Sequence, residues 1–312
     1  MSMPLMEHAT WTMAAGSKSF STAAKLFDAS TRRSTLMLYA WCRYCDDVID
    51  GQTLGMPGSQ HAVDDALARM AHLQLETRRA YSGATMTEPA FAAFQEVALM
   101  HHIPPQLAFD HLEGFAMDAR NQRYLSFDDT LRYCYHVAGV VGLMMARVMG
   151  VRDEKVLDHA CDLGLAFQLT NIARDIIEDA RNGRCYLPSD WLHPLGLHAE
   201  NLADVQHRAA IATLAARLVA EAEPYYQSAY AGLSGLPLRS AWAIATAHGV
   251  YREVGMKVLQ AGAQAWDARQ HTSKGEKLGL LLKGAMLAMR SRLVAPLARP
   301  AGLWQRPENP AR

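Results

Sequence analysis

Two short stretches of the sequence gather carboxylates at a spacing that suits metal and phosphate chemistry. They read DDVID at residues 46–50 and DIIED at residues 175–179, and each follows an apolar run. The first and last aspartates of each stretch are four residues apart, which places them on one face of a helix with a rise of about 6 Å between them. Carboxylates this close repel one another, and a divalent cation removes the repulsion. Oxygen ligands favour Mg²⁺ or Mn²⁺ over Zn²⁺.

Each acidic pair continues toward the N-terminus as a polar stripe at helical spacing. The two stripes are Asp50, Asp46, Arg43 and Tyr39, and Asp179, Asp175, Asn171 and Gln168. Apolar residues flank both stripes, whereas a solvated helix face normally mixes Lys and Glu in pairs. The alternative, that the stripes are solvated faces, therefore fits poorly. We expect the two stripes to face each other across one cavity, with Asp47 off the centre of its stripe.

Two facing acidic helices suit a diphosphate, because Mg²⁺ commonly binds through one or two carboxylates together with substrate phosphates. Basic side chains must then help to hold the phosphates. Arg43 and Arg174 stand beside the aspartates, where they either pair with them or reach a phosphate. Lys18, Arg184 and Arg252 are further candidates.

The elements that must position these residues are helical almost throughout. Helical periodicity predicts helices at about 30–50, 61–81, 87–100, 105–121, 126–149, 154–181, 200–221, 223–231, 237–264 and 276–295. Strand signals are nearly absent, and no linker divides the chain. We therefore predict a single all-α domain over residues 1–298, followed by a loose Pro- and Arg-rich tail over residues 299–312.

Composition excludes several other classes of protein. The 312 residues carry a formal net charge of zero, so no nucleic acid partner is indicated. Five cysteines at irregular spacing argue against a disulfide framework and favour the reducing cytoplasm. The longest apolar stretch, near residues 137–151, falls short of the roughly 20 residues that span a bilayer. The basic apolar segment 277–295 either lies on a membrane surface or packs as an ordinary helix.

Four sequence blocks in this order resemble the squalene/phytoene synthase family, whose members join prenyl diphosphates head to head. The blocks are YAWCRYCDDVID at 39–50, YCYHVAGVVG at 133–142, QLTNIARDIIED at 168–179 and GRCYLP at 183–188. The resemblance extends from GSKSFS at 16–21 to SKGEKL at 273–278. It implies the all-α isoprenoid synthase fold, with a central cavity between the helices.

The resemblance also implies roles for individual residues. The metal-binding group would be Asp46, Asp50, Asp175 and Asp179, with Asn171. The diphosphate- and substrate-binding group would be Ser17, Lys18, Ser19, Tyr39, Arg43, Gln168, Arg174, Arg184 and Tyr251, with Asn171 again lining the site. Tyr135 resembles a tyrosine linked to the later catalytic steps, although family members vary at the neighbouring Tyr133. Tyr133, Tyr135 and Tyr251 could instead be core aromatic residues with bonded hydroxyls.

The implied reaction is the condensation of two geranylgeranyl diphosphates to phytoene through prephytoene diphosphate, with release of diphosphate. It would use Mg²⁺ or Mn²⁺ without NADPH and would commit carbon to carotenoid biosynthesis. Its expected partners are the prenyl diphosphates, a membrane surface and other carotenoid-pathway enzymes. The nearest alternative is a thirty-carbon homologue that uses farnesyl diphosphate, such as a dehydrosqualene or squalene-type synthase. A non-enzymatic assembly factor of the same fold is remote, because all four inferred metal-binding carboxylates are present.

Overall fold

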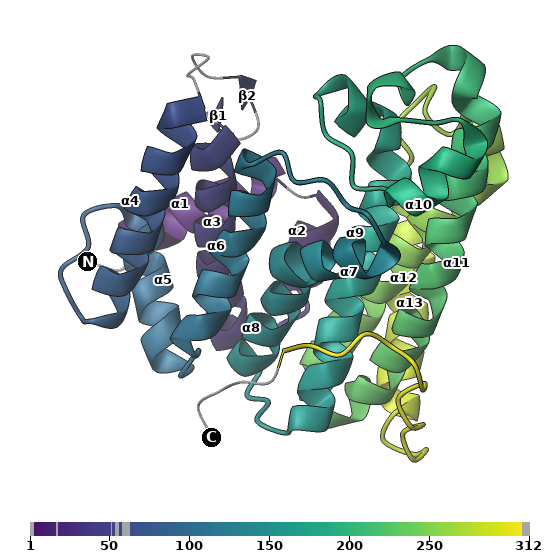
Figure 1. Ribbon diagram of the computed structural model, residues 1–312. Coiled ribbons are helices and arrows are strands. Elements are labelled where there is room, and N and C mark those ends of the chain that lie inside the picture. Colours follow the sequence, from purple (N-terminus) through teal and green to yellow (C-terminus); the bar gives the residue numbers. More distant parts are fainter. Residues whose placement is uncertain (1–2, 17, 51, 54–55, 58–62, 308–312) are drawn as a thin grey trace.

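The computed structural model describes residues 3–16, 18–50, 52–53, 56–57 and 63–307, and over these residues the fold is all-α, as predicted (Figure 1). The longer helices are α1 (Met3–Gly16), α2 (Lys18–Ala24), α3 (Ala29–Asp50), α4 (Val63–Tyr81), α5 (Pro89–Met100), α6 (Pro105–Ala119), α7 (Phe127–Cys134), α8 (Val140–Val148), α9 (Glu154–Arg181), α11 (Arg208–Gly232), α12 (Leu238–Ala261) and α13 (Lys274–Arg290). The π-helical turn η1 (Tyr135–Gly139) joins α7 to α8, and α10 (Ser189–Leu192) is a single turn. Two strands of two residues each, β1 (Gln52–Thr53) and β2 (Met56–Pro57), form an antiparallel pair.

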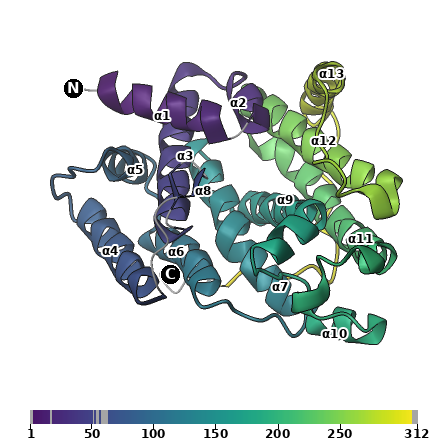
Figure 2. The same ribbon diagram turned by 90° about the horizontal axis from the view of Figure 1, so that it is seen from above.

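Helix α9 lies at the centre of the molecule. It packs against α8 and η1 on one side and against α11 and α12 on another. Figures 1 and 2 show α3, α4, α5 and α6 grouped on one side of α9, with α11, α12 and α13 on the other. The side chains of Trp41 and Phe94 stack at 4.0 Å between ring centroids inside the first group. The fold therefore places α3 and α9, the helices that carry the two acidic stripes, on different walls of the molecule's interior.

The structure differs from the predicted elements at three places. Helices α1 and α2 were not predicted. Helix α11 begins at Arg208 and continues through Pro224, where we expected a break. A proline removes one backbone donor from a helix, but α11 stays continuous because its apolar face packs along α9. The predicted helix 126–149 is interrupted at Tyr135–Gly139, where the π-helical turn shifts the register of the side chains that follow.

Close packing of η1 and α8 on α9 depends on two glycines. A Cβ at Gly142 would lie 2.3 Å from the carbonyl oxygen of Ala160, and a Cβ at Gly164 would lie 2.4 Å from that of Ala138. Real Cβ atoms do not approach backbone oxygens this closely. Glycine at both positions therefore lets the backbones of α8 and η1 come into contact with that of α9.

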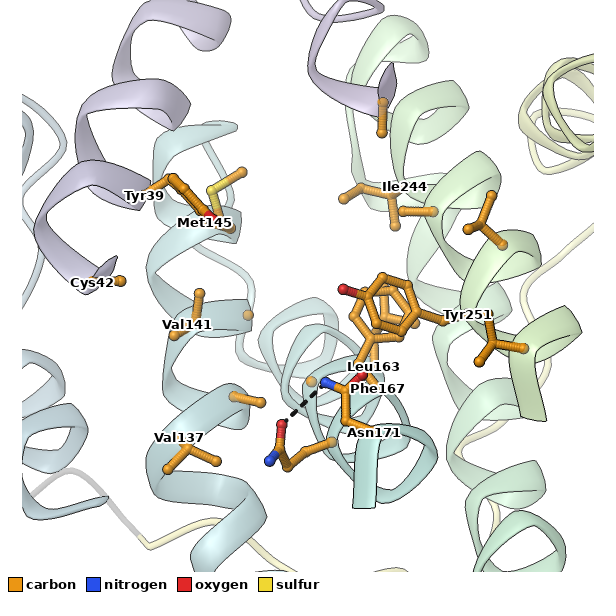
Figure 3. Close-up of a pocket in the computed structure, with 18 of the residues that line it drawn as sticks. Tyr39, Cys42, Val137, Val141, Met145, Leu163, Phe167, Asn171, Ile244 and Tyr251 are labelled. Atoms are coloured by element: carbon orange, nitrogen blue, oxygen red, sulfur yellow. Dashed lines mark hydrogen bonds between the residues drawn. The ribbon is translucent and has the colours of Figure 1, made fainter. Parts of the chain in front are cut away.

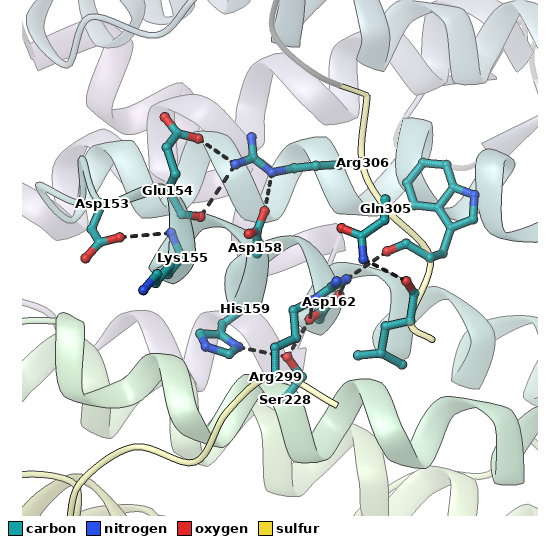
Figure 4. A network of polar contacts seen from close by, with 12 residues as sticks. Asp153, Glu154, Lys155, Asp158, His159, Asp162, Ser228, Arg299, Gln305 and Arg306 are labelled. Atoms are coloured by element: carbon teal, nitrogen blue, oxygen red, sulfur yellow. Dashed lines mark hydrogen bonds and ion pairs between the residues drawn. The ribbon is translucent and has the colours of Figure 1, made fainter. Parts of the chain in front are cut away.

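The C-terminal segment is anchored, contrary to the expectation of a loose tail. The guanidinium of Arg299 donates two hydrogen bonds of 2.8 Å to the carboxylate of Asp162, whose side chain is 1% exposed (Figure 4). Arg306 bonds to Asp158 at 2.6 Å, and the ring of Trp304 lies 5.3 Å from that of Tyr135. The expectation was wrong for residues 299–307, because their arginines pair with carboxylates of α9. Residues 308–312 lie outside the described part of the chain.

None of the helices among the described residues combines the length and the apolarity that crossing a membrane requires.

Candidate active site

A large cavity runs between α3, η1, α8, α9 and α12. Its volume is about 1310 Å³. Figure 3 shows Tyr39 of α3, Val141 and Met145 of α8, Phe167 of α9 and Tyr251 of α12 converging on it. The cavity has a charged region, lined by the C-terminal turns of α3 and α9, and an apolar region along the N-terminal half of α9.

The two polar stripes line this one cavity. From α3 it is lined by Tyr39, Arg43 and Asp46, and from α9 by Gln168, Asn171, Arg174, Asp175 and Asp179. The side chain of Asp50 lies outside the described residues, so its place in the stripe stays a prediction. Asp47 is buried and bonded to Arg43, and it is not among the lining residues.

The arginines beside the aspartates pair with them. The guanidinium of Arg43 lies 3.0 Å from Asp46 and 2.8 Å from Asp47. Burial alone would lower the pKa of Arg43, but the carboxylates of Asp46 and Asp47 raise it by more, so the net shift is upward. The Nε of Arg174 donates to Asp175 at 2.8 Å. Both arginines therefore stay charged and lie where an incoming phosphate competes with the carboxylates for them.

A further arginine at this end of the cavity, Arg269, lies in no sequence motif and was not predicted. Arg269, in the segment after α12, lies 3.4 Å from Asp175 and 3.2 Å from Glu178, and it lines the cavity. Its side chain is 60% exposed, so it is free to move between the carboxylates and a bound anion.

The surroundings of Asp179 disfavour the charged form of its carboxylate. Burial, followed by the neighbouring Asp175, raises its pKa to about 7, although Arg184 opposes the shift. The negative charge at this point is thus poorly compensated by the protein alone. A divalent cation would relieve it, since carboxylates are ligands that Mg²⁺ and Mn²⁺ prefer.

The donor set fits a cation that is shared with substrate rather than one that is caged by the protein. Among the described residues, no three His, Cys, Asp or Glu side chains converge as a ready-made metal site. Mg²⁺ typically binds through one or two carboxylates and completes its shell with water and substrate phosphates. Asp46 on one wall, with Asp175 and Asp179 on the other, offers that kind of partial site.

Aromatic and amide side chains form the wall next to the charged region. The ring of Tyr251 stacks on Phe167 with centroids 4.1 Å apart, and Asn171 donates to Gln168 at 3.3 Å (Figure 3). Burial raises the pKa of Tyr39 to about 12, and burial also raises the pKa of Tyr251. Both phenols therefore stay neutral and can donate hydrogen bonds to a phosphate.

The structure does not place Tyr135 among the residues that line the cavity, contrary to the position expected of a catalytic residue. Its hydroxyl donates to Asp110 at 2.8 Å, and its ring packs against Trp304 of the C-terminal segment. The cavity is lined instead by Tyr133, Val137 and Val141, which share one face at steps of four residues. Tyr135, two residues on from Tyr133, points to the other side.

Tyr133 belongs to a small polar cluster that sequence reasoning missed. Its hydroxyl and that of Tyr186 each donate to one carboxylate, Asp118, at 3.0 Å. All three residues line the cavity. Burial, followed by Asp118, raises the pKa of Tyr133 well above its usual value. The spacing of Tyr133 from Val137 and Val141 was the available signal, whereas nothing local marked Asp118.

The apolar region extends far from the carboxylates. Val156, His159, Ala160 and Leu163 of α9 line it. Ala160 precedes Asp175 by 15 residues (175 − 160), which is about 22 Å along a helix. The cavity therefore has the length to hold an extended hydrocarbon whose charged end lies among the carboxylates.

Four further predicted residues are not placed at the site. Ser17 lies outside the described residues, as do the side chains of Lys18 and Ser19. Arg252 pairs with Glu223 at 2.8 Å and is not among the lining residues. Arg184 does line the cavity, close to Asp179.

The fold is that of the all-α isoprenoid synthases. A crystal structure titled as a dehydrosqualene synthase in complex with a ligand matches with a TM-score of 0.81 and 26% identity, covering 92% of this chain and 98% of that one. A squalene synthase from Alicyclobacillus acidocaldarius shares the fold, with a TM-score of 0.70 at 24% identity over 83% of this chain and 92% of that one.

The chain belongs to the squalene/phytoene synthase family, because residues 13–276 match the family's sequence profile. It is 66% identical to the 15-cis-phytoene synthase of Pantoea ananas over 97% of this chain and 98% of that protein. It is 50% identical to the 15-cis-phytoene synthase of a Paracoccus strain, over 94% of this chain and 95% of that protein.

Proposed function

We propose that this protein is a 15-cis-phytoene synthase, which condenses two geranylgeranyl diphosphates head to head and releases diphosphate. The observation that carries the proposal is the single cavity that unites both acidic stripes with a long apolar region. Near-full-length identity to proteins named 15-cis-phytoene synthase supports the same substrate and product. The reaction commits geranylgeranyl diphosphate to carotenoid biosynthesis.

The charged region would bind and activate the first diphosphate. Bound Mg²⁺ or Mn²⁺ would neutralise the departing diphosphate as a Lewis acid. Asp46, Asp50, Asp175 and Asp179, with Asn171, would hold these cations. These residues fit a divalent cation for two reasons. The negative charge of Asp179 is poorly compensated by the protein, and the two walls of the cavity supply only part of a cation's oxygen ligands.

Basic residues and neutral phenols would position the diphosphates directly. Arg43, Arg174 and Arg184 would exchange carboxylate partners for phosphate oxygens, and Tyr39 with Tyr251 would donate hydrogen bonds. Ser17, Lys18, Ser19 and Gln168 complete the proposed substrate-binding set. Hydrogen-bond donors and cations directed at the diphosphate would stabilise the negative charge that develops on the leaving group.

The apolar walls would control the fate of the allylic cation. They fold the two prenyl chains so that the reacting carbons meet, which gives prephytoene diphosphate. They also exclude water, which would otherwise capture the cation as an alcohol. A second ionisation, rearrangement and loss of one proton then give the central double bond of phytoene.

Tyr133 and Asp118 are suited to accept that last proton. The phenol oxygen of Tyr133 can take a proton while its own proton passes to Asp118, to which it already donates at 3.0 Å. The relay leaves the phenol neutral, in keeping with its raised pKa. We place Tyr133 in this role in place of Tyr135.

The substrate assignment is tested by supplying purified protein with geranylgeranyl or farnesyl diphosphate, Mg²⁺ and no NADPH, and by identifying the hydrocarbon. Phytoene from the twenty-carbon substrate is expected. Consumption of farnesyl diphosphate alone would show a thirty-carbon synthase. We further propose a cytoplasmic site of action, in keeping with five free cysteines, and contact with other carotenoid-pathway enzymes.

A further inference from the structure

Helix α13 presents a row of large apolar side chains to solvent. Leu278, Leu282, Met286 and Met289 are each 61–65% exposed. The row continues past the helix with Leu293 and Leu297, which are 86% and 82% exposed. We call these six residues the α13 stripe. Exposed apolar side chains are ordinary when scattered, but a contiguous row of this kind marks an interaction surface.

The stripe faces directly away from the body of the protein. At about 100° per residue, the side chains of Leu278, Leu282, Met286 and Met289 fall within a sector of about 80°. The opposite face packs on α12 through Gly284 and Ala288, both of which are buried. Figure 2 shows α13 at the edge of the molecule, outside α12.

The stripe cannot be turned inward by rotating the helix. A Cβ at Gly284 would lie 2.5 Å from the hydroxyl oxygen of Thr246 and 3.0 Å from its backbone nitrogen. No larger side chain of α13 fits against α12 at this contact. The apolar row is therefore a fixed feature of the surface.

Cations flank the stripe on both sides. Lys274 lies on one side of the sector, and Lys283 and Arg290 lie on the other. All three are exposed, and they form no ion pair with another residue in the described part of the chain. The single acidic residue of α13, Glu276, is bonded to Lys257 of α12 at 2.8 Å. The face thus combines an apolar row with uncompensated positive charge.

The stripe also begins beside the cavity. Lys277, in the first turn of α13, lines the cavity, and so do Gln270, His271 and Thr272 of the segment before it. Leu278, the first member of the stripe, is the next residue. A bilayer lying against the stripe would therefore lie near the compartment that takes prenyl substrates.

We propose that the α13 stripe inserts into the boundary between headgroups and acyl chains of an anionic lipid bilayer, with Lys274, Lys283 and Arg290 on the lipid phosphates. A helix with an apolar row between cations binds a membrane surface in this way. A second copy of the chain fits the surface less well. A two-fold contact would bring the same cations face to face with no acidic residue of α13 to pair with them.

Vesicle flotation tests the proposal without any need for catalysis, so its failure is distinct from failure of the proposed function. The full-length protein should float with vesicles of phosphatidylcholine and phosphatidylglycerol in equal parts. The double variant Leu282→Asp/Met286→Asp should lose flotation. The matched control Leu67→Asp/Leu75→Asp changes two leucines of α4 that are 61% and 52% exposed, and it should float as wild type does.

A second variant tests the charges. Lys283→Gln/Arg290→Gln should weaken binding to the anionic vesicles about 25-fold, at about fivefold per charge, and should leave binding to pure phosphatidylcholine unchanged. Far-ultraviolet circular dichroism of each variant checks folding. Flotation of the Leu282/Met286 variant equal to that of wild type would overturn the proposal. The proposal would also be overturned if the wild type formed a dimer without lipid, and if the Leu282/Met286 variant abolished that dimer but still floated with the vesicles. The stripe would then be a contact between two copies of the chain.

Discussion

The anchored C-terminal segment makes a quantitative prediction for Arg299→Ala. This arginine donates two hydrogen bonds of 2.8 Å to Asp162. The Asp162 side chain is 1% exposed, and it also accepts a hydrogen bond from Ser228 of α11. Removing the guanidinium leaves a buried carboxylate without its counter-charge. We therefore expect a marked loss of stability.

The size of the loss follows from burial. Breaking a buried ion pair by removing one partner costs about 3–5 kcal/mol. With an unfolding entropy of about 2.1 cal/mol/K per residue, a chain of 312 residues should lose about 5–8 °C in Tm. Arg306→Ala is the matched control, because the side chains of its partners Asp158 and Glu154 are 33% and 45% exposed. Ion pairs of that kind contribute about 0–1 kcal/mol.

Urea denaturation followed by circular dichroism measures both variants. Arg299→Ala should lower the urea midpoint much more than Arg306→Ala does. The double variant Arg299→Ala/Asp162→Asn should recover part of the loss, because it removes the unpaired charge. Equal effects of Arg299→Ala and Arg306→Ala would refute the reasoning, because the burial of Asp162 would then not determine the size of the loss.

Three further outcomes follow from the cavity and the core. Tyr133→Phe should lower phytoene formation by about 10²-fold or more, whereas Tyr135→Phe should keep most activity and lose about 1 kcal/mol of stability; product assays and urea titrations separate the two. Ala160→Phe adds bulk to the apolar region about 22 Å from Asp175, so it should raise the preference for farnesyl over geranylgeranyl diphosphate when the two substrates compete. Burial lowers the pKa of His248 to about 4, so its neutral form stabilises the fold above pH 6.5, and this contribution is lost as the pH falls toward 4. Lowering the pH from 7 to 5 should cost about 2 kcal/mol at His248, and the step should be smaller in His248→Gln when unfolding is measured at both pH values.

The acidic stripes were predictable because their information is local. Spacing of three and four residues fixes which side chains share a helix face. The flanking apolar residues then indicate that this face lines an interior. The structure accordingly brings Asp46, Asp175 and Asp179 to one cavity. Most helices were also predictable, since hydrophobic periodicity and breakers are properties of short windows.

The position of Tyr135 outside the cavity lining has a local cause. Tyr133 lies in step with Val137 and Val141, so the same periodicity that marked the acidic stripes could have chosen it over Tyr135. The resemblance between family members, which vary at this point, pointed to Tyr135 instead. The π-helical turn at Tyr135–Gly139 adds a change of register that periodicity alone does not reveal.

The other features that the sequence did not reveal depend on contacts between residues far apart in the sequence. Arg299 bonds to Asp162, which lies 137 residues away in the sequence. The residues around Arg299 in the sequence do not indicate that partner. Arg269 and Asp118 likewise reach the cavity from segments with no motif of their own. Exposure of the α13 stripe depends on which face of α13 packs against α12, and that choice is made by Gly284 and Thr246 together.

The central claim is that the two acidic stripes act on one reaction in one cavity. Its most direct test is the rate of pyrophosphate release from geranylgeranyl diphosphate with Mg²⁺ in Asp46→Asn and, separately, in Asp175→Asn. The exposed Asp190→Asn serves as the control. Each single change should lower the rate about 10²–10³-fold, the loss expected when one electrostatic contact to a leaving group is removed, and the control should not change it. A wild-type rate in either Asp46→Asn or Asp175→Asn would contradict the claim.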